Sequence, residues 1–571
     1  MTAQHLVKKA YIHSAKYVRN QLRDKLSQAK ISGQLCLIAL LFALVATGVI
    51  LLFKLLLQWM THYTQTQSLN ITGFIEDWRV LLPLFGAFLI WLVAQMGSSR
   101  YKRMGIAYVM HRVKIHYGKI PLPSAPAQFF QALFALAGNF SVGKEGPAIH
   151  LGAVSASYLA EKFKLPDNSV RIMCASGIAA GIAAIFNSPL AAVIFVFEVI
   201  LREYKVHYFF PIMISAICGA LSSQLVFGNV HEYAHIGVLH IPLSQYPILA
   251  LCGIAIGVIA AIFNRSLLAV TETGQQWPLI YRLGLAGIIT CIIGMLLPQA
   301  LGSGELAIET IISGHPSIWL LFGLLVGKIV ATIAALGLGV PGGIIGPLYG
   351  IGAILGTLLA LIAASVFPDI APYIGLYTII GMSAMMGVCL NAPLAALVGM
   401  LELTNNASII LPSMVVVIPA FLISHQVLKT KSIFYRQMEI MGLDYKVSPV
   451  KLGLQKLGVR ALMDRRFVIV GHDDALLLEV LKRAEGRSVL SRDKQGNMQM
   501  LQLELQVTDD VSTLTRHPIQ GVPDTATLME VYDILSRERR GEVFIYQGDI
   551  QHIVGVISWA NIQQQIRSGQ I

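Results

Sequence analysis

Residues 187–192 read Asn-Ser-Pro-Leu-Ala-Ala, and 204 residues later residues 391–396 read Asn-Ala-Pro-Leu-Ala-Ala, identical at five of the six positions. Each copy precedes a glutamate by the same distance, Glu198 in the first and Glu402 in the second. Upstream of each copy lies a glycine-rich turn that ends in proline. We interpret the stretches as equivalent parts of two homologous halves, which predicts a pseudo-two-fold fold with its site where the halves meet.

The composition of the chain places most of it in a lipid bilayer. Of the 571 residues, 55% are hydrophobic and only 13% are charged, whereas a soluble protein carries about 25% charged residues. This composition excludes a cytosolic enzyme as a description of the whole chain, and we predict that the protein is not an enzyme.

The apolar stretches, which run almost without a break from Ile31 to Leu428, are of two kinds. Some reach the roughly 20 residues that a helix needs to cross a bilayer: Ile31–Met60, Val80–Met96, Phe209–Phe227, Tyr246–Phe263, Leu283–Leu301 and Leu320–Leu338. Others are short, glycine-rich and interrupted: 128–142, 146–160, 174–186, 188–200, 346–364 and 375–403. Interrupted segments at membrane depth surround a binding site, which favours a transporter or a channel.

The net charge of +12 comes largely from basic clusters in the N-terminal arm and in the loop at Arg100–Lys119. Such clusters mark the cytoplasmic face of a membrane protein. Because no basic stripe is interleaved with aromatic residues on a polar domain, we expect no nucleic-acid partner. We predict a multi-pass protein of the cell membrane, inner or plasma, with both termini in the cytoplasm.

The composition changes after the last apolar stretch, where charges occur throughout and two similar α/β patterns follow each other. We therefore predict three parts: a basic cytoplasmic arm at 1–30, a membrane domain at 31–440 and a cytoplasmic tail at 441–571. The two repeats of the membrane domain cover about 60–235 and 245–430.

The first glycine-rich turn, Gly143-Lys144-Glu145-Gly146-Pro147, opens a helix inside the membrane region. A helix N-terminus presents unpaired N–H groups and a partial positive charge, which together bind anions. A carboxylate at this place would occupy an anion site when ionised and vacate it when protonated or displaced. We predict that Glu145 gates an anion site to which Gly143, Lys144 and Gly146 contribute.

The second turn, Gly339-Val-Pro-Gly-Gly-Ile-Ile-Gly-Pro347, takes the equivalent place in the other half. Its side chains cannot donate hydrogen bonds, so the backbone would be the ligand. We predict anion binding at Gly343, Ile344, Ile345 and Gly346.

These turns and the repeated Asn-x-Pro-Leu-Ala blocks resemble the CLC family of chloride channels and proton-coupled chloride exchangers over about 31–440. The tail resembles a pair of CBS domains. The resemblance implies an all-α polytopic membrane protein with an inverted internal repeat, plus a small α/β cytoplasmic pair, in a homodimer whose subunits each hold an anion pathway. It also implies that Glu145 is the gate and that the amides of Ile344 and Ile345 hold the central anion.

Two positions of the predicted anion site depart from the family pattern. Met104 takes the place of a serine whose hydroxyl ligates the central anion, with Ser98 as the alternative donor, and a methionine there also resembles the fluoride-exporting branch. Phe434 takes the place of the central tyrosine, and a shift of one residue would bring in Tyr435. We include Met104, Phe434 and Tyr435 among the anion-binding positions.

A third departure concerns protons. Val199 takes the place of the inner glutamate that passes protons in the exchangers of the family, as it does in the family's channels. Glu203 is the alternative carrier, although its loop position favours a surface ion pair. Glu198 is interpreted as structural because Glu402 mirrors it, and His150 is more typical of a core residue than of a proton carrier.

In the tail, Asn561 takes the place of the aspartate with which CBS domains hold a nucleotide ribose, and Ser558 precedes it in the same motif. Adenine-nucleotide binding at these residues and a packing module without a ligand both stay open. We expect no metal and no other cofactor.

We predict transport of chloride or another small anion through a pathway gated by Glu145, as a channel or a weakly proton-coupled transporter. One alternative is a proton-coupled antiporter of chloride or fluoride, with protons as a second substrate. Another is a nucleotide-sensing membrane protein with little flux. The other predicted partners are the lipid bilayer and a second subunit.

Overall fold

The computed structural model describes residues 19–28, 30, 32–64, 78–96, 103–228, 233, 241–314, 316–471, 474–484, 486–493, 495–505 and 512–567. These residues form two compact units. The membrane unit comprises the described parts of Cys36–Leu159 and Ile172–Tyr445. The tail unit comprises the described parts of Met1–Leu35, Ala160–Arg171 and Lys446–Ile571.

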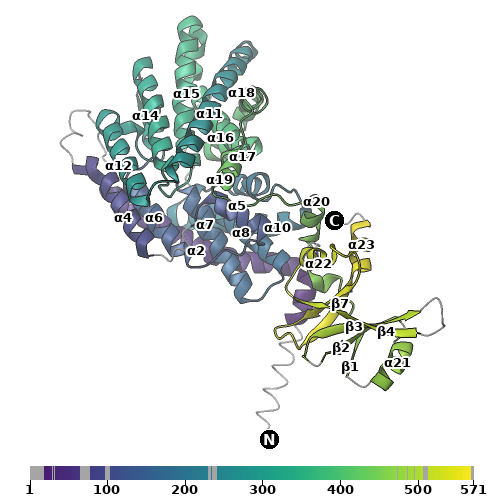
Figure 1. The fold of residues 1–571 in the computed structure, drawn as a ribbon. Coiled ribbons are helices and arrows are strands. Elements are labelled where there is room, and N and C mark those ends of the chain that lie inside the picture. The colour runs from purple at the N-terminus through teal and green to yellow at the C-terminus, as the bar shows by residue number, and fades with distance from the viewer. Residues whose placement is uncertain are drawn as a thin grey trace. The chain divides into compact units, whose positions relative to one another are not determined.

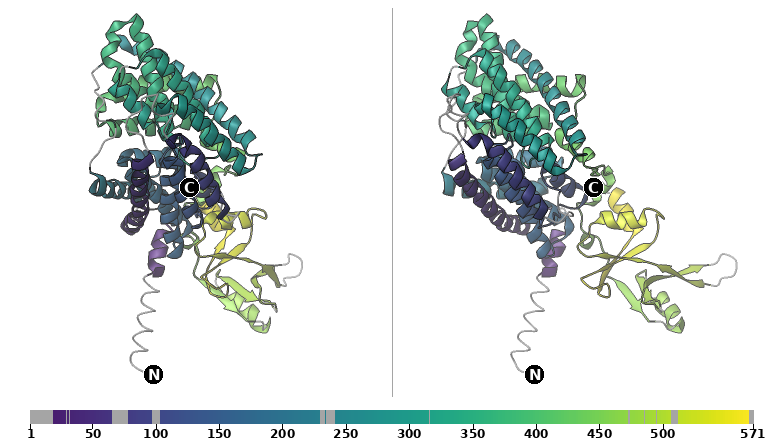
Figure 2. Two further views of the ribbon diagram at one scale, coloured as in Figure 1. Left: turned by 90° about the vertical axis from the view of Figure 1, so that its left-hand side faces the viewer. Right: turned by 60° about the vertical axis from the view of Figure 1, so that its left-hand side comes forward.

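The membrane unit is built from helices in two halves that follow each other along the chain. The first half contains α2 (Gly33–Thr64), α4 (Leu82–Met96), α5 (Ile106–Ile115), α6 (Ser124–Ala137), α7 (Glu145–Lys162), α8 (Asp167–Phe186), α9 (Pro189–Phe195), a π-helical segment (Val196–Leu201) and α10 (Val206–Phe227). The second contains α11 (Tyr246–Gly274), α12 (Leu279–Leu296), α13 (Glu305–Ser313), α14 (Ile318–Gly337), α15 (Ile345–Val366), α16 (Ile374–Leu390), α17 (Pro393–Thr404), α18 (Ile410–Leu422) and α19 (Ile433–Ile440). Within this unit the first half, purple to blue, and the second, teal to green, occupy separate regions (Figure 1), and two further views show the same separation (Figure 2).

Ten helices in the described part of the chain are long and apolar enough to cross a membrane. The predicted multi-pass, all-helical membrane fold is therefore confirmed. Two segments that the sequence marked as short and interrupted, 174–186 and 346–364, instead belong to the full-length helices α8 and α15. The glycines of these two segments lie inside the helices, where they allow close packing against a neighbouring helix.

The close packing is the same in both halves. A Cβ on Gly152 of α7 would collide with the carbonyl oxygen of Gly177 on α8, and a Cβ on Gly352 of α15 would collide with that of Gly381 on α16. Small residues let membrane helices approach closely enough for their backbones to touch. The equivalent contact extends the repeat well beyond its six-residue match.

The repeated Asn-x-Pro stretches are breaks between helices. Asn187 (φ 55°) and Asn391 (φ 58°) both adopt the left-handed conformation, which asparagine tolerates better than most residues. Pro189 and Pro393 then begin α9 and α17, where the missing N–H of proline costs no hydrogen bond. One short sequence therefore ends one helix and starts the next in each half.

The tail unit contains two small sheets. In the first, β1 (Phe467–Val470) is parallel to β2 (Ser488–Arg492), and β3 (Met498–Leu505) pairs antiparallel with β2 and with β4 (Ser512–Pro518). In the second, β6 (Glu542–Tyr546) pairs parallel with β5 (Gln520–Pro523) and antiparallel with β7 (Ile553–Ser558). The accompanying helices are α20 (Pro449–Leu454), α21 (Asp474–Arg483), α22 (Leu528–Leu535) and α23 (Trp559–Arg567). This arrangement is consistent with the predicted CBS-like pair.

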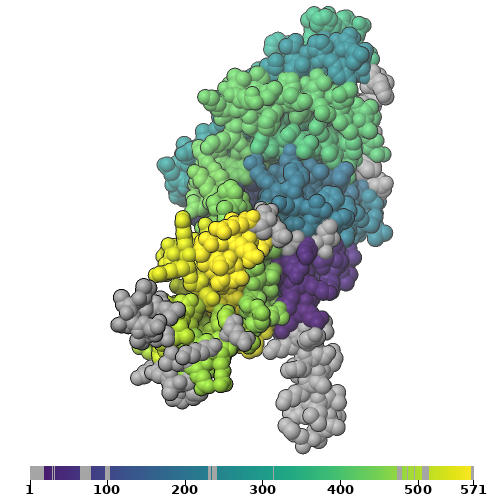
Figure 3. Space-filling view, turned by 90° about the vertical axis from the view of Figure 1, so that its right-hand side faces the viewer, coloured from purple at the N-terminus to yellow at the C-terminus, as the bar shows by residue number. Residues whose placement is uncertain are grey.

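A buried ion cluster joins the N-terminal arm to the second sheet of the tail unit. The guanidinium groups of Arg23 and Arg460 contact the carboxylate of Asp524 at 2.9 and 2.6 Å, and Arg460 also contacts Asp24 at 2.6 Å. Burial lowers the pKa of Arg23, and the charge of Asp524 opposes that shift. In the space-filling view the purple surface of the N-terminal residues borders the green and yellow surface of the tail (Figure 3). The described part of the arm is thus a structural part of the tail unit.

The connector between α7 and α8 also belongs to the tail unit. The backbone N–H of Asp167 donates to the carbonyl oxygen of Thr525 at 2.8 Å. The side-chain amide of Asn168 donates to the carbonyl oxygens of Leu26 and Lys456 at 3.0 and 3.2 Å. The tail unit therefore consists of three separate stretches of the chain that are hydrogen-bonded to one another.

We expect Asp524→Ala to release the arm from the rest of the tail unit. It leaves the guanidinium group of Arg23 buried without its carboxylate, while Arg460 keeps only Asp24, and breaking a buried ion pair costs about 3–5 kcal/mol. Hydrogen exchange of the full-length protein should show the amides of 19–27 and of β5 exchanging at least about tenfold faster. Asp549→Ala, at an exposed turn, is the control. Unchanged exchange in the arm of Asp524→Ala would contradict the prediction.

Candidate functional site

The two glycine-rich turns meet in the membrane unit. The N–H of Gly143 donates to the carbonyl oxygen of Gly343 at 2.8 Å, and the N–H of Gly343 donates back to Gly143 at 2.7 Å, so the turns form an antiparallel bridge. One residue of the pair comes from each half of the repeat. The two turns that hold the predicted site residues therefore meet between the halves, where a fold of this kind has its site.

Glu145 is the first residue of α7 and is completely buried. Its Oε1 accepts a hydrogen bond from the backbone N–H of Ile345, the first residue of α15. Its Oε2 has no hydrogen-bond partner among the described residues. The carboxylate thus lies against the N-terminus of a helix from the opposite half, where unpaired amides attract negative charge.

Glycine is required around this carboxylate because no side chain fits there. A Cβ on Gly143 or on Gly343 would collide with the carboxyl group of Glu145, and a Cβ on Gly146 would collide with the backbone of Gly342. Gly346 lies in the lining of the small pocket that also contains Glu145. All four predicted glycines therefore surround the carboxylate or the backbone beside it.

Lys144 contacts a different acid. Its Nζ lies 3.2 Å from Oε1 of Glu305, at the start of α13, and 5.5 Å from the centre of the Phe186 ring. These three residues line the small pocket beside Glu145. Lys144 therefore has its ion pair with Glu305, and its charge stays close to the predicted site.

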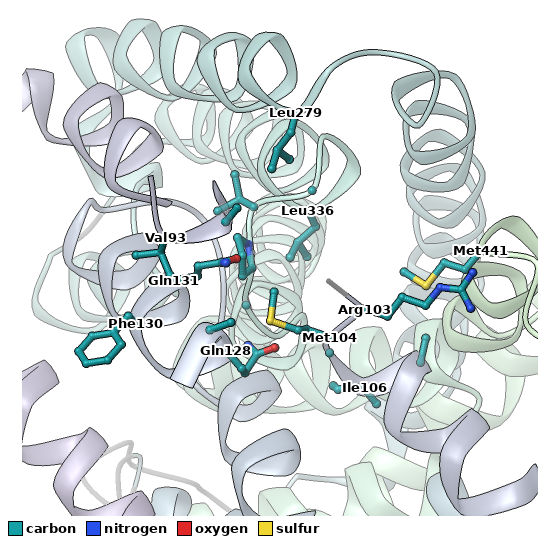
Figure 4. A pocket seen from close by; sticks show the side chains of 18 of the residues that line it. Val93, Arg103, Met104, Ile106, Gln128, Phe130, Gln131, Leu279, Leu336 and Met441 are labelled. Carbon is teal, nitrogen blue, oxygen red and sulfur yellow. The ribbon is translucent and has the colours of Figure 1, made fainter. Parts of the chain in front are cut away.

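A cavity of about 1050 Å³ reaches the second turn, and its lining includes Gly342, Ile344, Met104 and Phe434. Figure 4 shows the Met104 side chain extending into this cavity beside Gln128. The structure thus brings three of the predicted anion-binding positions, Met104, Ile344 and Phe434, to one cavity.

Tyr435 is not among the described residues that line this cavity. Its ring instead lies 4.3 Å from the guanidinium carbon of Arg202 and 4.9 Å from the ring of Tyr445. Of the two neighbouring aromatic residues, Phe434 faces the cavity without any shift of register. Ser98, the alternative donor, lies outside the described residues.

Glu198 and Glu402 each bind backbone N–H groups of the opposite half. The carboxylate of Glu198 accepts from the N–H groups of Leu394 and Ala395 in α17, at 3.1 and 2.6 Å. The carboxylate of Glu402 accepts from the N–H groups of Leu190 and Ala191 in α9, at 2.9 and 2.8 Å. Each glutamate therefore caps the equivalent helix of the other half, which agrees with the structural role predicted for Glu198.

The candidate proton carriers Glu203 and His150 lie on different elements, and Val199 takes the place of a third. Val199 is buried in the π-helical segment, and Glu203 is half-buried in the loop that follows it. His150 is completely buried on α7, with Nε2 2.9 Å from the Ser124 hydroxyl and its ring stacked on Tyr108 at 6.3 Å. Its Nδ1 is buried without a hydrogen-bond partner among the described residues, so only one of the two ring nitrogens is satisfied.

The predicted nucleotide residues contact each other in the tail unit. The N–H and the hydroxyl of Ser558 both donate to Oδ1 of Asn561, and the N–H of Asn561 donates to the Ser558 hydroxyl at 3.3 Å. Together they cap the N-terminus of α23. A ribose bound by Asn561 would have to compete with this cap.

Sequence reasoning missed Lys328, which is completely buried on α14. Its Nζ donates to the carbonyl oxygens of Ala300, Leu301 and Gly302, at 3.1, 3.3 and 2.6 Å, and so holds the loop in front of α13. A lysine in the middle of an apolar stretch was the signal that could have found it.

The model of the voltage-gated chloride channel family matches residues 85–425, a range that contains both turns and both Asn-x-Pro stretches. A putative chloride channel protein, ClcB-like, of Ralstonia nicotianae is 27% identical over 373 residues, which are 63% of this chain and 86% of that protein. The H(+)/Cl(−) exchange transporter ClcA of Vibrio campbellii is 29% identical over 313 residues, which are 52% of this chain and 66% of that protein.

Solved structures share the fold. A slow cyanobacterial Cl−/H+ antiporter has a TM-score of 0.65 at 22% identity, covering 72% of this chain and 99% of its own. A eukaryotic CLC transporter has a TM-score of 0.63 at 18% identity, covering 95% of this chain and 98% of its own. A CLC-type fluoride/proton antiporter has a TM-score of 0.59 at 21% identity, covering 71% and 97%.

Proposed function

The chain belongs to the voltage-gated chloride channel family, and on that premise we propose that it carries chloride or another small anion across a membrane along a path gated by Glu145. The observation that supports this most directly is the hydrogen bond from the first amide of α15 to the carboxylate of Glu145, where the two halves meet. A helix N-terminus of this kind is an anion site. The ionised side chain holds that site, and an anion takes it only when the side chain leaves.

Protonation of Glu145 weakens the binding of its side chain at the anion site. A neutral carboxyl group loses the attraction of the helix N-terminus, which acts on charge. Anion flux should therefore depend on the protonation of Glu145 whether or not protons cross the membrane.

Within this proposal we favour a channel or a weakly proton-coupled transporter. Val199 has no titratable group, and the neighbouring Glu198 is engaged with two amides of α17. The alternative is a proton-coupled antiporter of chloride or fluoride, which the names of the ClcA relatives favour and which would require another inner acid, such as Glu203.

We also propose a homodimer, as the family implies, in the inner or plasma membrane. The basic clusters support a cytoplasmic location of both termini. Adenine-nucleotide binding by Ser558 and Asn561 stays a prediction. A nucleotide sensor with little flux is the remaining alternative.

Purified protein in liposomes, with chloride loss and proton uptake recorded together under a proton gradient, tests the proposal. We expect passive chloride loss with little proton movement, compared with protein-free liposomes. Chloride driven uphill by protons would make the protein an antiporter, and Glu203→Gln would then show whether Glu203 carries them. The absence of flux for both chloride and fluoride would contradict anion transport itself.

A further inference from the structure

Two glutamines line the cavity that reaches the second turn. Gln128 and Gln131 lie three residues apart on α6, so they share one face of that helix. Their side chains are 1% and 4% exposed. The other polar side chains in the described lining are half-buried or exposed: Gln95, Arg103, Gln275, Arg282 and Gln437. The buried polar side chains of the described lining are therefore these two glutamines.

Neither glutamine side chain takes part in a hydrogen bond within the described part of the chain, and Oε1 of Gln128 is buried without a partner. Buried polar groups are hydrogen-bonded in the great majority of cases. Two neighbouring amides without protein partners, both on one cavity, leave their N–H groups available to a molecule in the cavity.

The chemistry of the cavity restricts what that ligand is. The thioether of Met104 accepts hydrogen bonds weakly and donates none, and the side chains of Ile344 and Phe434 have no N–H or O–H. A glutamine amide carries two N–H donors, and rotation of its last bond brings either end toward a ligand. Figure 4 shows Met104, Gln128 and Gln131 extending toward the same space. The free donors suit a ligand that only accepts.

We propose that Gln128 and Gln131 bind the transported anion in this cavity through their amide N–H groups, and that they set its selectivity. The inference rests on the proposed function and adds to it the residues that replace the donor missing at Met104. The buried polar side chains of the described lining are neutral amides, which do not offset the dehydration of a strongly hydrated anion. The site therefore favours chloride, bromide and nitrate over fluoride.

Gln128→Leu, Gln131→Leu and the double variant test this inference, because leucine is close in size and donates no hydrogen bond. Chloride binding is measured by calorimetry, and the fluxes of nitrate and chloride are measured in liposomes. We expect each single variant to bind chloride about tenfold more weakly, as for the loss of a hydrogen bond to a charged group. The ratio of nitrate to chloride flux should rise, because chloride is the better hydrated anion and loses more.

Gln128→Glu replaces a donor with a negative charge at almost unchanged shape, and its chloride flux should fall by more than about tenfold. Gln276→Leu, exposed beyond the end of α11 and outside the lining, is the control and should behave as the wild type. Gln128→Met and Gln131→Met, which keep the length of the side chain, replace any leucine variant that does not elute as folded protein.

The outcomes separate this inference from the proposed function. Wild-type protein that moves no anion overturns the proposed function and this inference with it. Wild-type protein that moves chloride, beside a folded double variant with unchanged chloride affinity and an unchanged nitrate-to-chloride ratio, overturns this inference alone.

Discussion

Glu145→Gln should transport chloride at a rate that no longer depends on pH, and at high pH this rate should exceed that of the wild type by about tenfold or more. The neutral amide cannot hold the N-terminus of α15 as a carboxylate does, so the anion meets no competing charge at any pH. In the wild type we expect the opposite dependence, with flux rising as the pH falls, because protonation removes the charge of Glu145. Chloride efflux from liposomes over a pH series measures both.

Glu305→Gln is the matched control for this experiment. It also removes a carboxylate from the small pocket beside Glu145, but that carboxylate contacts Lys144 rather than an amide of α15. The pH dependence of the wild type should persist in Glu305→Gln. A Glu145→Gln protein that kept the same pH dependence would show that Glu145 is not the gate.

Glu402→Ala should destabilise the membrane unit by about 3–6 kcal/mol, because it removes two charge-assisted hydrogen bonds and leaves the N-terminus of α9 uncapped. Glu198→Ala should have an effect of similar size, since it removes the equivalent pair from α17. The midpoint of thermal aggregation in detergent, followed by size-exclusion chromatography, measures both changes.

The glutamine variants at these positions should be destabilised less, because one amide oxygen still accepts a hydrogen bond. Glu272→Ala, at the exposed end of α11, provides the control. If Glu198→Ala were as stable as this control while Glu402→Ala were not, the two caps would not be equivalent, and the symmetric interpretation of the repeat would be wrong.

The two halves and the place where they meet could be predicted from the sequence. Glycine, asparagine and proline occur where the backbone conformation or a close contact requires these residue types. Gly143 and Gly343 are needed where no side chain fits, and Asn187 and Asn391 where the chain turns left-handed. Such requirements depend on the local conformation, so a single sequence is enough to see them.

Contacts between the halves could not be predicted in the same way. The equal spacing of Glu198 and Glu402 was visible in the sequence. That each carboxylate binds a helix of the opposite half depends on how α9 and α17 pack. The sequence placed Gln128 and Gln131 in an interrupted apolar segment, and only the packing of α6 decides which of its faces lines the cavity. The arm was identified by its charge alone, although Arg23 is buried against Asp524.

The ion cluster of the tail unit also has a consequence for biosynthesis. Arg23 and Asp524 are 501 positions apart in the chain. At roughly 5–20 residues per second, a ribosome makes Asp524 about 25–100 s after Arg23. All the helices of the membrane unit are translated in that interval. The tail unit is therefore the last part of the protein whose contacts can be completed. A nascent chain that stalls before Asp524 already contains Asn168 and Arg460, which contact the arm. It leaves Arg23 without its carboxylate, so the ion cluster stays incomplete.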